Sequence, residues 1–355
     1  MFRFQPVALL TLLWFCLACA TANVPAANVP VTPPAPAPRV FAKGADISWL
    51  PQMEASGYVF RNAAGVAQDC FQILKDHGIN TIRLRTWVNP SGHPINGHCS
   101  RDETVAMAVR AKKWGMRLML NFHYSDTWAD PGKQAKPAAW QSHDFPTLLT
   151  DVDRYTREVM NALKTSDITP EWVQVGNEIP GGFLLPEGGT DNWPQLGQLL
   201  NAGYAAVKAV SPASKVVLHV DQGNDRARFR YWFGQATAQR VKYDVIGLSY
   251  YPYWLPGNPD YTLSINDLGA NMTDLAARYG KEVMVVEVGG EDNKPQNTYD
   301  MLVAVQQKTR AVPNEKGLGV LYWEPQGARS WSQYGLSAWG ADGKPTQALR
   351  AFLVE

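Results

Sequence analysis

The chain has 355 residues, of which 45% are hydrophobic and 18% are charged. This composition supports a sizeable buried core and excludes a wholly disordered chain. The 33 Lys and Arg residues balance 32 Asp and Glu residues, for a formal net charge of +1. No net field therefore draws the protein to nucleic acid or to an anionic membrane, and we expect neither as a partner.

The first 20 residues have the pattern of a secretory signal. Arg3 precedes an apolar run from Val7 to Ala20, which closes on the small-x-small sequence Ala18-Cys19-Ala20. The run is shorter than the roughly 20 residues that span a membrane. We therefore predict a signal peptide at 1–20 and a secreted, extracellular protein. Lipid attachment at Cys19 is the alternative; it would anchor the chain at the cell surface, although Cys16-Leu17-Ala18 is a poor match to a lipobox.

Residues 21–39 form a Pro- and Ala-rich stretch with no charge before Arg39. Such a composition is typical of a semi-rigid linker, so we place the folded part of the chain at 40–355. Export would leave two cysteines, Cys70 and Cys99, and oxidising surroundings favour a disulfide between them. Two unpaired thiols are the alternative. We interpret the histidines near Cys99, His93 and His98, as part of a polar loop and predict no metal site there.

From residue 40 onward, short apolar runs alternate with longer amphipathic segments. The apolar runs predict strands at 43–48, 80–85, 117–122, 171–175, 215–221, 243–249, 283–287 and 317–323. The amphipathic segments predict helices at 65–77, 102–114, 144–164, 192–210, 226–240, 263–280 and 298–311, with a last one near 345–353.

Eight strands, each followed by a helix, predict an α/β protein that folds as a single (β/α)8 TIM barrel. We expect it to be a monomer. The alternative is an open doubly wound sheet, which would favour a glycine-rich phosphate loop after an early strand. Neither GxGxxG nor GxxxxGK[ST] occurs in the sequence.

Polar or aromatic residues stand at the carboxyl ends of all eight predicted strands, where a barrel places its chemistry. Two carboxylates, Glu178 and Glu287, each close an apolar strand. Glycoside hydrolysis uses such a pair, one as proton donor and one as nucleophile. Arg83 or Arg85 beside Glu287 would keep it charged, and Asn177 could bind a sugar 2-hydroxyl. The alternative is a helix cap at Glu178 and a strand-end ion pair at Glu287.

The sequence around these residues resembles the barrel glycosidases of clan A, and within it glycoside hydrolase family 53, the arabinogalactan endo-β-1,4-galactanases. The matching stretches run from residue 44 to residue 325: Gly44-Ala-Asp-Ile-Ser48, NTIRLRTWVNP (80–90), FHYSDTWADPGKQAKPAAW (122–140), VQVGNEI (173–179), GLSYYPYW (247–254), VVE (285–287) and LYWEP (321–325). The stretch at 122–140 is specific, whereas Asn-Glu alone would only indicate the clan.

The resemblance implies retaining cleavage of β-1,4-galactan, the side chain of pectic arabinogalactan, with Glu178 as acid/base and Glu287 as nucleophile. By the same resemblance, Arg83 takes the arginine position on the second strand, in preference to Arg85. Other residues implied in the substrate site are Asn177, Tyr251, Trp323, Asp46, His123, His219 and Asp221. Trp128 is a candidate platform for stacking on a sugar ring.

Three departures from the family pattern affect the loops after strands 7 and 8: Val288-Gly-Gly290 after Glu287, a short loop at 288–297, and Gln-Gly-Ala-Arg-Ser after Pro325. They leave the subsites and product length open. We expect no cofactor; a structural calcium on Glu291, Asp292 and Asn293 is the alternative. A clan A mannanase or xylanase and a non-catalytic sugar-binding barrel remain alternative functions.

Overall fold

The computed structural model describes residues 1–2, 40–90 and 98–354, and Val40–Glu355 form one compact unit. The predicted linker, Cys19 and His93 lie outside the described residues, as does all of the predicted signal peptide beyond residue 2. Within the described residues, no helix is both long enough and apolar enough to cross a membrane.

Eight parallel strands close into a barrel in sequence order, with the first strand paired to both the second and the eighth. This confirms the predicted single (β/α)8 barrel. The strands are β1 (Ala42–Asp46), β2 (Thr81–Thr86), β3 (Arg117–Phe122), β4 (Trp172–Val175), β5 (Lys215–Val220), β6 (Val245–Tyr250), β7 (Glu282–Val288) and β8 (Gly317–Trp323).

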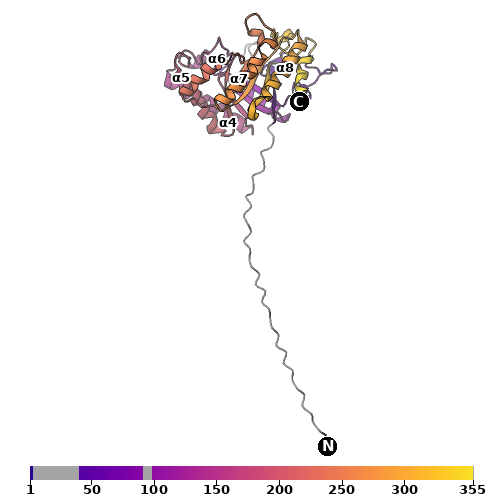
Figure 1. The fold of residues 1–355 in the computed structure, drawn as a ribbon, viewed down its shortest axis with the longest axis horizontal. Helices are drawn as coiled ribbons and strands as arrows, with labels where there is room; N and C mark the ends of the chain where they lie inside the picture. Colours follow the sequence, from indigo (N-terminus) through magenta and orange to yellow (C-terminus); the bar gives the residue numbers. More distant parts are fainter. Residues whose placement is uncertain (3–39, 91–97, 355) are drawn as a thin grey trace. The chain divides into compact units, whose positions relative to one another are not determined.

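Helices follow the strands and pack on the outside of the barrel (Figure 1). Their bounds are α1 (Leu50–Ala55), α2 (Cys70–Asp76), α3 (Arg101–Lys113), α4 (Phe145–Thr165), α5 (Trp193–Val210), α6 (Arg226–Ala238), α7 (Ile265–Arg278), α8 (Pro295–Arg310) and α9 (Arg329–Ser332). The predicted helix at 65–77 begins later, at Cys70, because the Asp69 side chain caps it. The last predicted helix is a 3₁₀ helix at Gln347–Leu353.

The barrel interior has an apolar floor and a polar layer nearer the carboxyl ends of the strands. On β3, β4 and β5, a buried apolar residue of the floor precedes a buried polar residue by two positions, which places both on the inner face. These pairs are Met119 and Asn121, Trp172 and Gln174, and Val217 and His219. The polar layer therefore lies directly beneath the barrel mouth.

A bulge in β7 turns Glu287 into the barrel. Leu248 of β6 pairs with Val285, but the next residue, Ser249, pairs with Glu287, so that Val286 is extra. Val286 belongs to the interior cluster and Val285 to the outer one. Regular alternation would therefore point Glu287 outward. A bulge re-aims the side chains that follow it, and here it brings Glu287 to the inner face.

The expected Cys70–Cys99 disulfide is absent, because both cysteines are free and buried. Cys70 begins α2, whereas Cys99 lies in the loop before α3, where its thiol faces the carbonyl of Ser48. Burial raises the pKa of the Cys70 thiol well above its usual value and that of Cys99 to about 12.

The thiols should therefore be unreactive in the folded protein, since the thiolate is the nucleophile. We expect a thiol-reactive dye to label neither cysteine of the native 40–355 chain within minutes and to label both after denaturation. Rapid labelling of the native chain would contradict this burial, and labelling of neither after denaturation without reductant would reveal a disulfide.

Candidate active site

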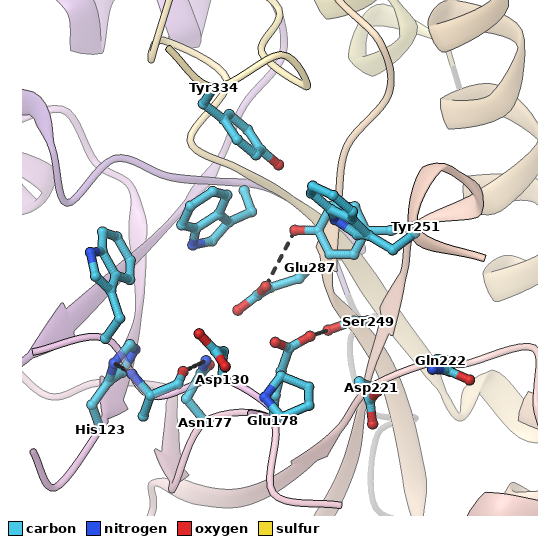
Figure 2. A pocket seen from close by; sticks show the side chains of 15 residues that line it. His123, Asp130, Asn177, Glu178, Asp221, Gln222, Ser249, Tyr251, Glu287 and Tyr334 are labelled. Atoms are coloured by element: carbon cyan, nitrogen blue, oxygen red, sulfur yellow. Dashed lines mark hydrogen bonds between the residues drawn. The ribbon is translucent and has the colours of Figure 1, made fainter. Parts of the chain in front are cut away.

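A cavity of about 490 Å³ opens at the carboxyl ends of the barrel strands. Both predicted catalytic carboxylates, Glu178 and Glu287, lie on its wall and point toward one another in Figure 2. The other lining residues are His123, Trp128, Ala129, Asp130, Pro131, Asn177, Asp221, Gln222, Ser249, Tyr251, Trp254, Trp323 and Tyr334.

Glu287 is held between a cation and a hydroxyl group. Its Oε1 lies 2.8 Å from Nη1 of Arg83, and its Oε2 accepts a hydrogen bond of 3.2 Å from the Tyr251 hydroxyl. Arg83 is therefore the arginine beside Glu287, as expected over Arg85. Burial raises the pKa of Glu287, while Arg83 and Tyr251 oppose that rise by stabilising the charged form.

Glu178 follows β4 and has a backbone conformation that few residues adopt. Its φ is 43°, two residues after Gly176, whose φ is 82°. The Gln134 amide braces this turn by donating to the carbonyls of Asn177 (2.8 Å) and Glu178 (3.0 Å). Such strain persists only where the surroundings hold it. Burial and the charge of Glu287 together raise the pKa of Glu178 well above its usual value.

The two carboxylates thus have different environments. Glu287 has a direct ion pair with Arg83, whereas Glu178 is hydrogen-bonded by the neutral Ser249 hydroxyl at 2.5 Å. A pair whose surroundings separate the two pKa values in this way suits one protonated acid and one ionised nucleophile.

Arg83 is the centre of the polar layer under the cleft. Its Nη1 also contacts Asp46 at 2.9 Å, and its Nη2 donates to Gln174 at 3.0 Å and to Asn177 at 2.8 Å. Asp46, Arg83 and His219 are at most 1% exposed and are not among the cavity-lining residues. The expectation that Asp46 and His219 line the substrate site is therefore wrong: the inner face of the barrel holds both beneath it.

Asn177 lines the cleft, and hydrogen bonds to both its amide oxygen and its amide nitrogen fix its orientation. Its Oδ1 accepts from Arg83 and Gln174, and its Nδ2 donates to the Ala129 carbonyl at 2.7 Å. The second Nδ2 hydrogen remains for a sugar hydroxyl, which is the contact expected of Asn177.

His123 and Asp221 both reach the cavity. His123 accepts hydrogen bonds at Nδ1 from Trp87 and from the Ala129 amide, both at 3.1 Å. Burial and the charges of Arg85 and Arg83 lower the pKa of His123 well below its usual value, so that it is neutral. Asp221 forms an ion pair of 2.7 Å with Arg228, and burial raises its pKa.

An aromatic wall stands on one side of the cleft. Trp323 packs edge-on against Tyr334, with 4.8 Å between ring centroids, and its centroid lies 5.7 Å from that of Trp128. Trp128 covers the guanidinium of Arg85 at 4.2 Å, and Arg85 forms a buried ion pair with Glu324. The candidate platform Trp128 and the implied site residue Trp323 thus both lie on this wall.

The carboxylates considered for calcium are paired with cations. Asp292 forms a double hydrogen bond with Arg329, at 2.8 and 2.7 Å, and Glu291 contacts Lys294 at 2.6 Å. Within residues 40–90 and 98–354, no group of three or more His, Cys, Asp or Glu residues is placed to hold a metal ion. The loop therefore does not present the six or more oxygen ligands that calcium takes.

The site also contains residues that the sequence reasoning did not select. Gln174 could have been found, because strand alternation places this polar residue on the inner face, two positions after Trp172. Ser249 likewise shares a face with Tyr251. Tyr334 comes from an irregular segment after α9, and no sequence pattern indicated it. The other lining or supporting residues that were not selected are Gln134, Glu324, Gln222 and Asp130.

The glycosyl hydrolase family 53 model matches residues 42–352, which include the whole barrel and both carboxylates. The chain belongs to glycosyl hydrolase family 53. This confirms the resemblance seen in the sequence and makes the protein a glycoside hydrolase.

Family 53 relatives match along nearly the full barrel. An Emericella nidulans protein named arabinogalactan endo-β-1,4-galactanase A is 36% identical over 303 residues, covering 80% of this chain and 84% of its own. A solved fungal β-1,4-galactanase is 30% identical, with a TM-score of 0.79, over 88% of this chain and 98% of its own. The family 53 catalytic domain of Ignisphaera aggregans is 28% identical, with a TM-score of 0.80, over 88% and 95%.

Proposed function

We propose that this family 53 hydrolase is a secreted endo-β-1,4-galactanase that cleaves β-1,4-galactan with retention of configuration. The observation that carries the proposal is the pair Glu178 and Glu287, which face one cleft from environments that separate their ionisation (Figure 2). The names of the family 53 relatives support galactan as the substrate. The signal-like sequence at 1–20 supports export.

In the first step, Glu287 attacks the anomeric carbon while the glycosidic bond breaks. Glu178 gives its proton to the departing oxygen, so that the leaving sugar is released with a free hydroxyl. Arg83 keeps Glu287 ionised, and Tyr251 orients its second oxygen. The high pKa of Glu178 keeps its proton available for this step.

In the second step, water hydrolyses the glycosyl ester on Glu287, and Glu178 accepts the proton of that water. Ester formation removes the negative charge of Glu287, which is one of the causes that raise the pKa of Glu178. The pKa of Glu178 therefore falls in the intermediate, and the same group changes from acid to base.

The test is reducing-sugar release from β-1,4-galactan, β-mannan and xylan by the purified protein, with product configuration followed by proton NMR. We expect release from galactan and a β-anomer as the first product. Release from mannan or xylan alone would reject the substrate and keep the mechanism. A first product with the α configuration would reject retention, and no release from any glycan would favour a sugar-binding barrel.

Trp254 is expected to bind a sugar ring of the substrate. It lines the same cleft as Glu178 and Glu287, yet 63% of its surface is exposed. An exposed tryptophan face at a cleft suits stacking on a sugar ring. We expect Trp254→Ala to lower kcat/KM on long galactan by about tenfold, which corresponds to about 1.4 kcal/mol.

The thermal unfolding midpoint of Trp254→Ala should be almost unchanged, because little buried area is lost. Trp140→Ala is the matched control: Trp140 also follows a strand but is 2% exposed, so its loss should chiefly lower stability. Unchanged kcat/KM in a folded Trp254→Ala enzyme would show that this ring does not bind substrate.

A further inference from the structure

The structure assigns a positioning role to Ser249, which rests on the proposed function of Glu178. We propose that Arg83, Gln174, His219 and Ser249 form a chain of hydrogen bonds in which each group donates to the next. This chain makes Ser249 a constant hydrogen-bond donor to the Glu178 carboxyl group, and so favours the ionised form that Glu178 needs as a base.

The donor and acceptor roles along this series of hydrogen bonds are fixed first at Arg83. A guanidinium carries only donors and stays protonated in proteins. Nη2 of Arg83 lies 3.0 Å from Oε1 of Gln174, so this oxygen must be the acceptor, which fixes the orientation of the Gln174 amide. The Gln174 nitrogen then faces Nδ1 of His219, at 3.0 Å.

One ring nitrogen of His219 accepts a hydrogen bond, and the other donates one. Nδ1 is approached by two groups that can only donate, the Gln174 nitrogen and the backbone N–H of Glu178 at 3.3 Å. Oδ1 of Asn177 also lies 3.2 Å from Nδ1, but this oxygen already accepts from Arg83 at 2.8 Å and from Gln174 at 3.0 Å. Nδ1 is therefore unprotonated, and the hydrogen of the neutral ring is on Nε2. Burial and the charge of Arg83 lower the pKa of His219, which keeps the ring neutral. Nε2 lies 2.7 Å from Oγ of Ser249.

Ser249 completes the chain. Its oxygen accepts from His219, and its single hydrogen is directed to Oε1 of Glu178 at 2.5 Å. A donor held in this way stabilises a carboxylate more than a carboxylic acid. The bulge in β7 puts Ser249 opposite Glu287, so the same register that aims the nucleophile also positions this donor.

Of the other groups around Glu178, some raise its pKa and others lower it. Burial is the strongest influence raising its pKa, followed by the negative charges of Glu287 from β7 and Asp221 after β5, whereas the positive charge of Arg83 from β2 lowers it. The neutral groups on the neighbouring strands are His219 and Tyr251. The charge of Glu287 is lost in the glycosyl ester, while the Ser249 donor persists through both steps. Ser249 therefore matters most when Glu178 must be ionised to activate water.

The test is a carbon-13 NMR titration of the full chain labelled at the glutamate carboxyl carbons, with Glu178 assigned by Glu178→Gln. We expect Ser249→Ala to raise the pKa of Glu178 by about one unit, the scale of a hydrogen bond to a charged group, while Ser249→Thr keeps it near the wild-type value. An unchanged Glu178 pKa in folded Ser249→Ala would overturn the proposal. So would an equal rise in Ser249→Thr, since that variant retains the hydroxyl.

If Ser249→Ala does not fold, Ser249→Cys replaces it, because a thiol fills the space and is a weak donor; the same upward shift is expected. Kinetics provide a second readout. The basic limb of kcat/KM should move upward with the Glu178 pKa, because the first step needs the protonated acid. The titration requires no substrate, so a wild-type enzyme that fails to cleave galactan would reject the proposed function without deciding the role of Ser249.

Discussion

Glu287→Ala is expected to lower the rate of galactan hydrolysis at least about a thousandfold, which corresponds to about 4 kcal/mol of lost transition-state stabilisation. The variant lacks the oxygen that attacks the anomeric carbon, and Glu178 alone cannot form the covalent intermediate. Reducing-sugar release measures the loss. Glu291→Ala is the matched control, because Glu291 lies in the following loop, paired with Lys294, and should retain nearly full activity.

Azide separates the roles of the two carboxylates. With an activated aryl galactobioside, azide should enter the space left in Glu287→Ala and displace the aryl group directly, which yields the α-glycosyl azide. In Glu178→Ala, the ester still forms on Glu287, and azide should displace it from the other face to give the β-azide. The opposite assignment of products would exchange the two roles, and full activity in Glu287→Ala would reject Glu287 as the nucleophile.

Arg83→Met should destabilise the folded protein by about 3–5 kcal/mol, the range for a buried ion pair that loses one partner. Arg83 is fully buried, and its removal leaves the carboxylates of Asp46 and Glu287 without the cation that faces both. Urea unfolding at pH 7 measures the change. Arg230→Met is the control, since its partner Asp274 lies at the surface and the pair should contribute little.

The stability loss of Arg83→Met should depend on pH. Without the cation, the pKa of Glu287, which burial already raises, should rise further in the folded state. A carboxyl whose folded pKa lies above its unfolded value stabilises the protein below the unfolded pKa and loses that contribution as the pH rises through the folded one. The loss should therefore be smaller at pH 4 than at pH 7. An equal loss at both values would show that the charge of Arg83 is not the reason for it.

Local patterns in the sequence were sufficient to predict the barrel. Each strand is a short apolar run and each helix an amphipathic one, and both patterns depend on neighbours a few residues away. Glu178 and Glu287 were predicted in the same way, because a strand that ends in a carboxylate is visible along the chain. Their presence in one cleft then follows from the parallel order of the strands.

What the sequence missed or left open has a common physical reason, which is that it depends on contacts between distant residues. Asp292 pairs with Arg329, which lies 37 residues later, so the sequence of the 288–297 loop left calcium open as an alternative. Cys70 and Cys99 are suited to a disulfide by composition, yet the fold buries each as a free thiol. Tyr334 reaches the cleft from an irregular segment, where neither helical nor strand periodicity gives a direction to a side chain.

The fold class and the family follow from the sequence alone, as does the prediction of the two carboxylates, because each is carried by periodicity or by contiguous motifs. The directions in which those side chains point depend on the packing of the strands. Alternation along β7 places Glu287 outward, and the register against β6 reverses it. Strand alternation also places His219 inward, but its burial and the direction of its hydrogen bonds come from Arg83 on another strand. Orientation within the site is set by pairing between strands, and that pairing is not encoded in any one segment.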